Sequence, residues 1–128
     1  WESFKKAVSN YPNIIDTSKV GFMGHSFGGG ASFAMAHKGF IDEGWGQNGR
    51  FIFAMAQWYS HQITSQELNN FPANAKLITQ VYDDDTTNDH RLAIDIFKNN
   101  NIPNTEKDFI RKHWQESCHH AISYLTGV

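Results

Sequence analysis

The most constraining segment of the chain is an apolar run that passes directly into the sequence GHSFG at residues 24–28 and then into further small residues. Residues 19–23 have the composition of a strand, and residues 27–38 have that of a helix, with Gly39 as its expected stop. Glycines on both sides of Ser26 remove side chains that would collide in a very tight turn. The segment therefore predicts a buried strand, a sharp turn at Ser26 and a helix packed close against a sheet.

A serine at such a turn is suited to nucleophilic catalysis. The turn would raise the Ser26 hydroxyl to the top of the sheet, and the next helix would direct its unpaired N–H groups and positive dipole end toward it. The backbone N–H of Phe27 would then donate to a developing oxyanion. Two other interpretations are a glycine-rich turn with a buried hydroxyl and an anion-binding turn at a helix N-terminus.

Composition and charge exclude several classes of function. The chain has 128 residues, 40% of them hydrophobic, which suits one globular domain. Thirteen acidic and eleven basic residues give a net charge of −2 without a basic stripe, so we expect no nucleic-acid partner. The longest apolar run, residues 51–56, is too short to span a membrane. With the single cysteine Cys118, neither an internal disulfide nor a thiolate zinc site is expected.

Strand and helix patterns alternate along the chain. Helix patterns cover residues 1–8, 27–38, 65–70 and 89–98, and an apolar patch at 121–125 indicates the start of another. Strand patterns cover residues 20–23, 51–56, 76–82 and 107–111, of which 51–56 is apolar on both faces, as interior parallel strands are. In the helix at 89–98, the residues expected to face inward are Leu92, Ala93, Ile96 and Phe97. This alternation predicts an α/β fold, a three-layer α/β/α sandwich around a mostly parallel sheet.

Acidic residues and histidines follow two of the later strands. Residues 83–85 are all aspartate and come directly after the strand at 76–82, and His119 and His120 follow the last strand. Because the carboxyl ends of parallel strands meet at one edge of a sheet, we expect these side chains to lie near Ser26. The chain order is serine, aspartate, histidine.

In this order the chain resembles the α/β-hydrolase fold, whose catalytic triad follows the same sequence of residues. The GHSFGG segment, the turn YDDDT at 82–86 and the downstream histidine look most like the esterase, dienelactone hydrolase and polyester hydrolase relatives within that fold. The resemblance implies a serine hydrolase that cleaves small-molecule or polymeric carboxylic esters through an acyl-enzyme intermediate, without a cofactor. It covers all 128 residues but only the C-terminal half of the fold, so we expect earlier strands and a second oxyanion-hole donor upstream of Trp1.

The resemblance also assigns the acid. Ser26 is the nucleophile, and Asp85 is the expected acid because it follows the turn position, Tyr82, by three residues. Asp84 is the main alternative. An aspartate behind the histidine would hold its tautomer and stabilise the imidazolium. Asp89 is instead expected to cap the next helix.

The expected base is His119, which falls where the family histidine would, on the loop after the last strand. A histidine suits this role because its pKa lies near the operating pH. His120 is the first alternative and His113 the second. His25, inside the turn, resembles the variant of the family in which that histidine supports the turn and is not the base.

Aromatic residues mark a candidate substrate pocket. Trp58 and Tyr59 follow the strand at 51–56, at the expected catalytic edge, where they would line an acyl or aryl pocket or act as ordinary core and surface aromatics. The connection at 57–75 is too short for a large cap domain, which predicts an open site.

Other chemistries are open to parts of this sequence. The oxygen-bearing residues at 83–89 alternate as calcium-loop ligands do, but Asn88 and Ile94 replace the required glycine and glutamate, so no metal site is expected. A thioesterase, peptidase or acyltransferase would use the same triad, and a binding domain would keep the fold without turnover. The sequence assigns neither a compartment nor an oligomeric state.

Overall fold

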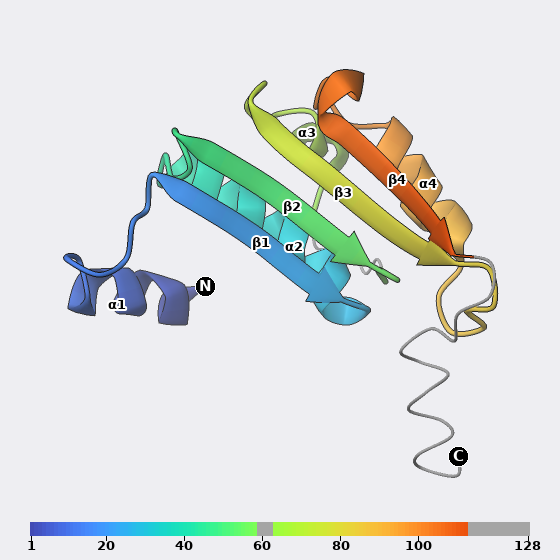
Figure 1. Ribbon diagram of the computed structural model, residues 1–128, viewed down its shortest axis with the longest axis horizontal. Helices are drawn as coiled ribbons and strands as arrows, with labels where there is room; N and C mark the ends of the chain where they lie inside the picture. Colours follow the sequence, from blue (N-terminus) through green and yellow to red (C-terminus); the bar gives the residue numbers. More distant parts are fainter. Residues whose placement is uncertain (59–62, 113–128) are drawn as a thin grey trace, which may run out of the picture.

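A four-stranded parallel sheet forms the centre of the protein. The computed structural model describes residues 1–58 and 63–112. Its strands are β1 (Lys19–His25), β2 (Gly49–Met55), β3 (Ala75–Tyr82) and β4 (Lys107–Lys112). They lie in the order β1-β2-β3-β4, every neighbouring pair is parallel, and all four strands end at the same edge (Figure 1). The α/β class and the parallel sheet predicted from the alternation are confirmed.

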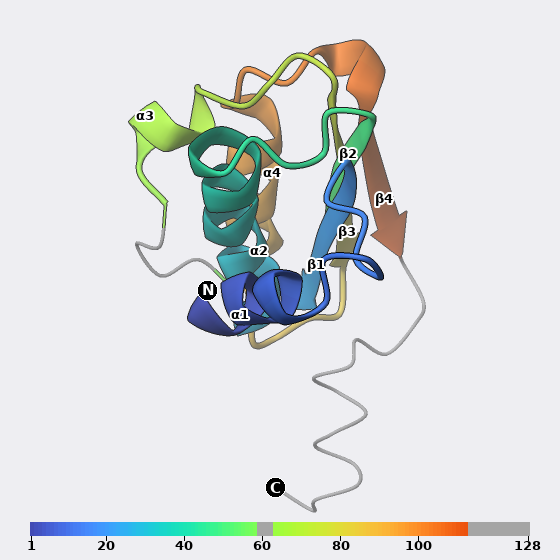
Figure 2. The same ribbon diagram turned by 90° about the vertical axis from the view of Figure 1, so that its left-hand side faces the viewer.

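The described helices lie on one side of this sheet, as the edge-on view in Figure 2 shows. They are α1 (Glu2–Asn10), α2 (Phe27–His37), α3 (Ser65–Leu68) and α4 (His90–Lys98), with a short 3₁₀ turn at Asn104–Glu106. Right-handed crossovers that all step in one direction across a sheet carry their helices over the same face, which accounts for the positions of α2, α3 and α4. No helix among the described residues is both long and apolar enough to cross a membrane.

The core fills the space between this helix layer and the sheet. Parallel pairing sets Phe22, Ile52 and Leu77 side by side on three strands. All three are buried, and Phe33 of α2 packs in the same cluster with no exposed surface. Side chains of a strand alternate between its two faces, so this row places alternate residues of β2 and β3 in the core.

Two glycines give the helix layer its close fit. A Cβ atom on Gly29 of α2 would lie 2.9 Å from the Cβ of Gln57 and 3.0 Å from the carbonyl oxygen of Met55. Gly39 is not the stop that its position predicts, because α2 continues into a π-helical turn at Lys38–Asp42. A Cβ atom on Gly39 would meet the ring of Phe22 at 2.8 Å, so this glycine makes room for a core side chain instead.

Two positions predicted to face inward are exposed. Met23 is 62% exposed because β1 is the outer strand of the described sheet and Met23 lies on the face without helices. The strand at 20–23 is therefore not buried as a whole, and Phe22 alone of its residues is fully in the core. Leu92 is 47% exposed in the first turn of α4, whereas its neighbour Ala93 is 1% exposed and faces the sheet.

Asp89 caps α4, as predicted. Its Oδ1 accepts a hydrogen bond from the Arg91 backbone N–H at 2.9 Å, and the Arg91 guanidinium Nε donates to Oδ2 at 2.9 Å. The side-chain and backbone hydrogen bonds from Arg91 lower the pKa of Asp89 from 3.8 to about 2. The ionised carboxylate is therefore the form that the folded helix stabilises.

Replacing Asp89 with asparagine is expected to flatten the loss of stability in acid. Because the folded pKa is depressed, the carboxylate contributes stability above its unfolded pKa of 3.8, and this contribution is lost as the pH falls through about 2. Asparagine keeps a capping oxygen but does not titrate. Thermal unfolding between about pH 5 and pH 2 measures the effect, with Asp95→Asn in the same helix as the control. Parallel acid profiles for Asp89→Asn and the wild type would contradict the prediction.

Candidate active site

Ser26 connects β1 to α2 in a strained backbone conformation. Its φ is 56° and its ψ is −121°, a region that residues with side chains rarely adopt. The end of β2 holds this turn, because the Ser26 N–H donates to the carbonyl of Met55 at 3.0 Å and the Ser26 carbonyl accepts from the N–H of Trp58 at 2.9 Å. The sharp turn predicted at Ser26 is present, and it is kept in place by the neighbouring strand.

The two glycines of the turn are not equivalent. A Cβ atom on Gly24 would lie 2.1 Å from the carbonyl oxygen of Gly28 and 2.3 Å from its carbon, which is closer than any real contact. Apart from its chain neighbours and the backbone of its own helix, a Cβ atom on Gly28 would meet no described atom within 4 Å. The expectation that both glycines relieve a collision is therefore right for Gly24 and wrong for Gly28.

The start of α2 supplies hydrogen-bond donors beside Ser26. Phe27 is the first residue of the helix, so its N–H has no acceptor within the helix. The positive end of the helix dipole lies at the same place. This N–H is the donor that the sequence predicts for an oxyanion, and it lies directly after the candidate nucleophile.

An exposed aromatic pair borders the turn. The rings of Phe27 and Trp58 are in contact, with centroids 5.7 Å apart and planes tilted by 31°. Phe27 is 54% and Trp58 is 42% exposed, so the pair presents ring surface to solvent. Trp58 thus lies next to Ser26, as expected from the sequence, while its predicted companion Tyr59 lies outside the described residues.

The three adjacent aspartates have three different environments. Asp83 forms an ion pair with Arg111, 2.6 Å between carboxylate and guanidinium, which joins the ends of β3 and β4. One carboxylate oxygen of Asp84 is buried. The Oδ1 atom of Asp85 accepts hydrogen bonds from the N–H groups of Thr87 at 2.9 Å and Asn88 at 3.0 Å, which closes the loop after β3.

Asn88 connects that loop to the serine, and the sequence analysis did not identify it as a site residue. Its side-chain Nδ2 donates to the carbonyl of Ala56 at 2.6 Å and to the Oγ of Ser26 at 3.4 Å. Only 6% of Asn88 is exposed. Because the partners are separated by 62 and 32 positions in the sequence, no local pattern marks this residue.

Of the four histidines considered for the site, the structure describes His25. His119, His120 and His113 all lie outside the described residues. His25 is the last residue of β1, and its Nε2 atom is buried. In residues 1–58 and 63–112, no group of three or more histidine, cysteine, aspartate and glutamate side chains is placed to hold a metal ion.

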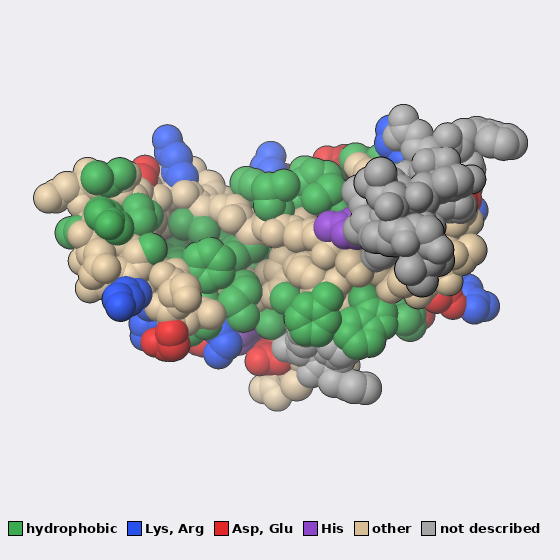
Figure 3. Space-filling view, turned by 90° about the horizontal axis from the view of Figure 1, so that it is seen from below, with side chains coloured by type: hydrophobic (Ala, Val, Ile, Leu, Met, Phe, Trp, Pro, Cys, Tyr) green, Lys and Arg blue, Asp and Glu red, His purple; other side chains and the backbone are tan. Residues whose placement is uncertain are grey.

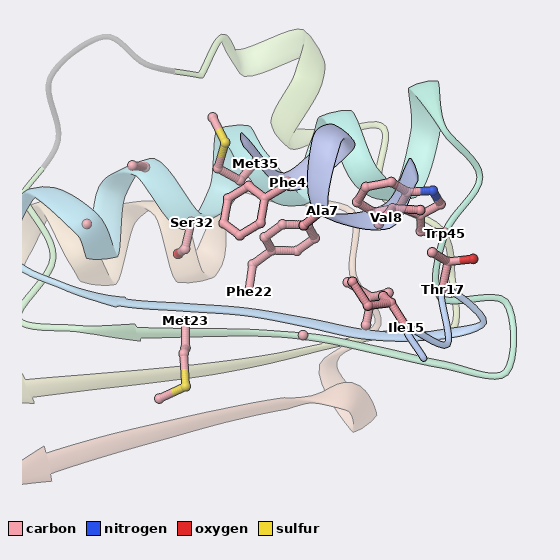
Figure 4. A pocket seen from close by; sticks show the side chains of 14 residues that line it. Phe4, Ala7, Val8, Ile15, Thr17, Phe22, Met23, Ser32, Met35 and Trp45 are labelled. Atoms are coloured by element: carbon pink, nitrogen blue, oxygen red, sulfur yellow. The ribbon is translucent and has the colours of Figure 1, made fainter. Parts of the chain in front are cut away.

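An apolar groove runs beside the outer edge of β1. It has a volume of about 480 Å³ and lies between α1, β1 and α2. Phe4, Phe22 and Met35 point toward one another in it, and Met23 points to the other side of β1 (Figure 4). Hydrophobic side chains gather in patches along this side of the molecule, seen from below in Figure 3.

The structure thus brings together Ser26, Phe27, Trp58 and the loop that carries Asp85 and Asn88. These residues follow β1, β2 and β3 at the single edge where the parallel strands end. A scan of the chain against protein-family models and a search of curated proteins found no match. Arguments about function therefore depend on the geometry of this edge.

Proposed function

We propose that this chain carries the catalytic residues of a serine hydrolase that cleaves carboxylic esters. The observation that carries the proposal is the backbone of Ser26, with φ 56° and ψ −121°, between a parallel strand and a helix. Residues held in such sparsely populated conformations cluster at active sites, because the surrounding structure must maintain their strain. A serine raised in this way at a strand-to-helix turn is the arrangement of the nucleophile elbow.

The proposed mechanism proceeds through an acyl-enzyme. The Ser26 Oγ attacks the ester carbonyl carbon while its proton passes to a ring nitrogen of His119, the base that the sequence indicates. The N–H of Phe27 donates to the tetrahedral oxyanion. As the intermediate collapses, the C–O bond to the alcohol breaks and His119 returns the proton to the leaving oxygen. Water then releases the acid from Ser26 by the same two proton transfers.

The other proposed roles follow from position. Asp85, with Asp84 as its alternative, would orient the base from the loop after β3, the loop whose Asn88 contacts Ser26 Oγ. The exposed rings of Phe27 and Trp58 would contact the acyl or alcohol part of the substrate, together with Tyr59. No cofactor takes part in these steps.

The proposal also extends the fold to the three-layer sandwich of the α/β hydrolases. Met23 is 62% and Phe51 is 39% exposed. They alternate along their strands with the buried Phe22 and Ile52, so they lie on the sheet face opposite the described helices. Parallel sheets are ordinarily covered on both faces, because their strands are apolar on both. In the proposed fold a second helix layer covers these residues, and further strands pair with the outer edge of β1.

A fluorophosphonate probe tests the proposal in the full-length protein. We expect covalent labelling at Ser26 alone, located by mass spectrometry of the digested protein, because the probe reacts with an activated serine. Ser32→Ala is the control, since Ser32 lies in α2, the helix that follows Ser26, but is 4% exposed and donates its hydroxyl to the Gly29 carbonyl at 2.6 Å. This variant should be labelled as the wild type is. Labelling at another serine, or none in the folded protein, would contradict the proposal and favour a binding domain.

A further inference from the structure

The side-chain amide of Asn88 contacts two strained residues at once. Within the described part of the chain, the non-glycine residues with positive φ are Ser26, at 56°, and Ala56, at 41°. Asn88 Nδ2 donates to the Oγ of Ser26 at 3.4 Å and to the carbonyl of Ala56 at 2.6 Å. Strained conformations persist where neighbouring groups over-determine them, and this amide is such a group for both turns.

The backbone of Asn88 holds the candidate acid. Its N–H donates to Asp85 Oδ1 at 3.0 Å, while its side chain reaches the serine. The nucleophile on the β1 turn and the acid on the β3 loop are therefore joined through one buried residue. Loops at the end of a sheet move more than its strands, so a connection of this kind limits how far the two groups can separate.

The direction of the hydrogen bond is also suited to the chemistry. A hydroxyl oxygen has two lone pairs and one proton. Accepting from Asn88 occupies one lone pair of Ser26 Oγ, which leaves the other for attack and the proton for the base. Hydrogen bonds at such sites are often long in the resting protein and shorten as charge develops on the acceptor. The 3.4 Å separation is compatible with that behaviour.

We propose that Asn88 is a positioning residue that sets the orientation of Ser26 Oγ and its distance from the acid loop. This inference rests on the proposed function of Ser26. Asn88 acts through the serine and through Asp85, and it takes no part in bond making or proton transfer. Loss of its amide should therefore slow the chemical step and leave substrate binding almost unchanged.

The test compares two alanine variants of buried asparagines at opposite ends of α4. Asn88→Ala removes the contact to Ser26 but keeps the backbone N–H that binds Asp85. Asn100→Ala is the matched control, because Asn100 is 9% exposed and its Nδ2 donates to the carbonyls of Ile96 at 2.7 Å and Phe97 at 3.0 Å. Both variants lose a buried amide with two acceptors, and Asn100→Ala also loses the Oδ1 that accepts from the Ile102 N–H at 3.0 Å, so its thermal midpoint should fall at least as far as that of Asn88→Ala.

The readouts are the hydrolysis of p-nitrophenyl acetate and the second-order rate of fluorophosphonate labelling at Ser26. Asn88→Ala should lower kcat and the labelling rate by about 10- to 100-fold with KM almost unchanged, since misplacement of a reacting group by about 1 Å has effects of this size. Asn100→Ala should keep both rates near the wild-type values. Asn88→Asp keeps the shape but cannot donate when ionised, so it should be slowed at least as much as Asn88→Ala.

The outcomes separate this inference from the proposed function. If wild-type Ser26 is labelled and Asn88→Ala reacts at the wild-type rate, Asn88 has no positioning role and the hydrolase proposal stands. An equal loss of rate in Asn100→Ala would show a general effect of stability and would overturn the inference. If Asn88→Ala does not fold, a wild-type rate in Asn88→Asp overturns it instead. Absence of labelling at Ser26 in the wild type would contradict both the proposed function and the role of Asn88.

Discussion

Replacing Ser26 with alanine is expected to lower ester hydrolysis by the full-length protein by about 10⁴- to 10⁶-fold. The variant keeps the Phe27 N–H and the aromatic pair but has no oxygen to form the acyl-enzyme, so it retains only the catalysis that binding and the oxyanion donors provide. The fold should survive, because the hydrogen bond that the Ser26 hydroxyl makes within the described residues is the 3.4 Å contact from Asn88. Hydrolysis of p-nitrophenyl acetate measures the rate, and circular dichroism checks the fold.

A glycine at the same position distinguishes the loss of the nucleophile from the relief of backbone strain. Ser26→Gly should be as inactive as Ser26→Ala but should unfold at a higher temperature, because glycine adopts a φ of 56° without the steric cost that a Cβ atom brings. Undiminished hydrolysis in either variant would rule out Ser26 as the nucleophile. Equal unfolding temperatures for the two variants would show that the backbone of this turn stores little strain.

The second large effect is expected at Gly24. Replacing it with alanine puts a Cβ atom 2.1 Å from the Gly28 carbonyl oxygen. The atoms that this Cβ meets belong to the backbone, so either the end of β1 or the start of α2 must move. We expect the free energy of unfolding to fall by about 3 kcal/mol or more, as in severe overpacking. Hydrolysis should fall at least about 100-fold, because Ser26 and the Phe27 N–H lie between the displaced elements.

Gly28→Ala is the matched control in the same turn. Apart from its chain neighbours and the backbone of its own helix, no described atom lies within 4 Å of the added Cβ, and alanine favours a helix over glycine by up to about 1 kcal/mol. This variant should therefore be as stable as the wild type or slightly more so. Urea unfolding of both variants measures the difference. A stable, active Gly24→Ala protein, or a Gly28→Ala protein destabilised to the same degree, would contradict the steric account of the turn.

Features that depend on neighbouring residues in the sequence were predictable from it. The tight turn at Ser26 follows from a strand, flanking glycines and a helix within twenty residues, and the cap at Asp89 follows from one polar residue before an amphipathic helix. The interior position of β2 follows from its apolar residues on both faces. The catalytic roles of Asp85 and His119 stay predictions, since they were inferred from chain order and from a resemblance.

Features that depend on pairing across long stretches of chain were decided by the tertiary structure. The exposure of Met23 depends on the place of β1 in the strand order, and the need for Gly39 depends on where the ring of Phe22 lies. The contact between Asn88 and Ser26 joins residues 62 positions apart. Local sequence determines backbone preferences and caps because these arise within a few residues, whereas exposure, close approach and side-chain bridges arise only when the sheet has set which segments meet.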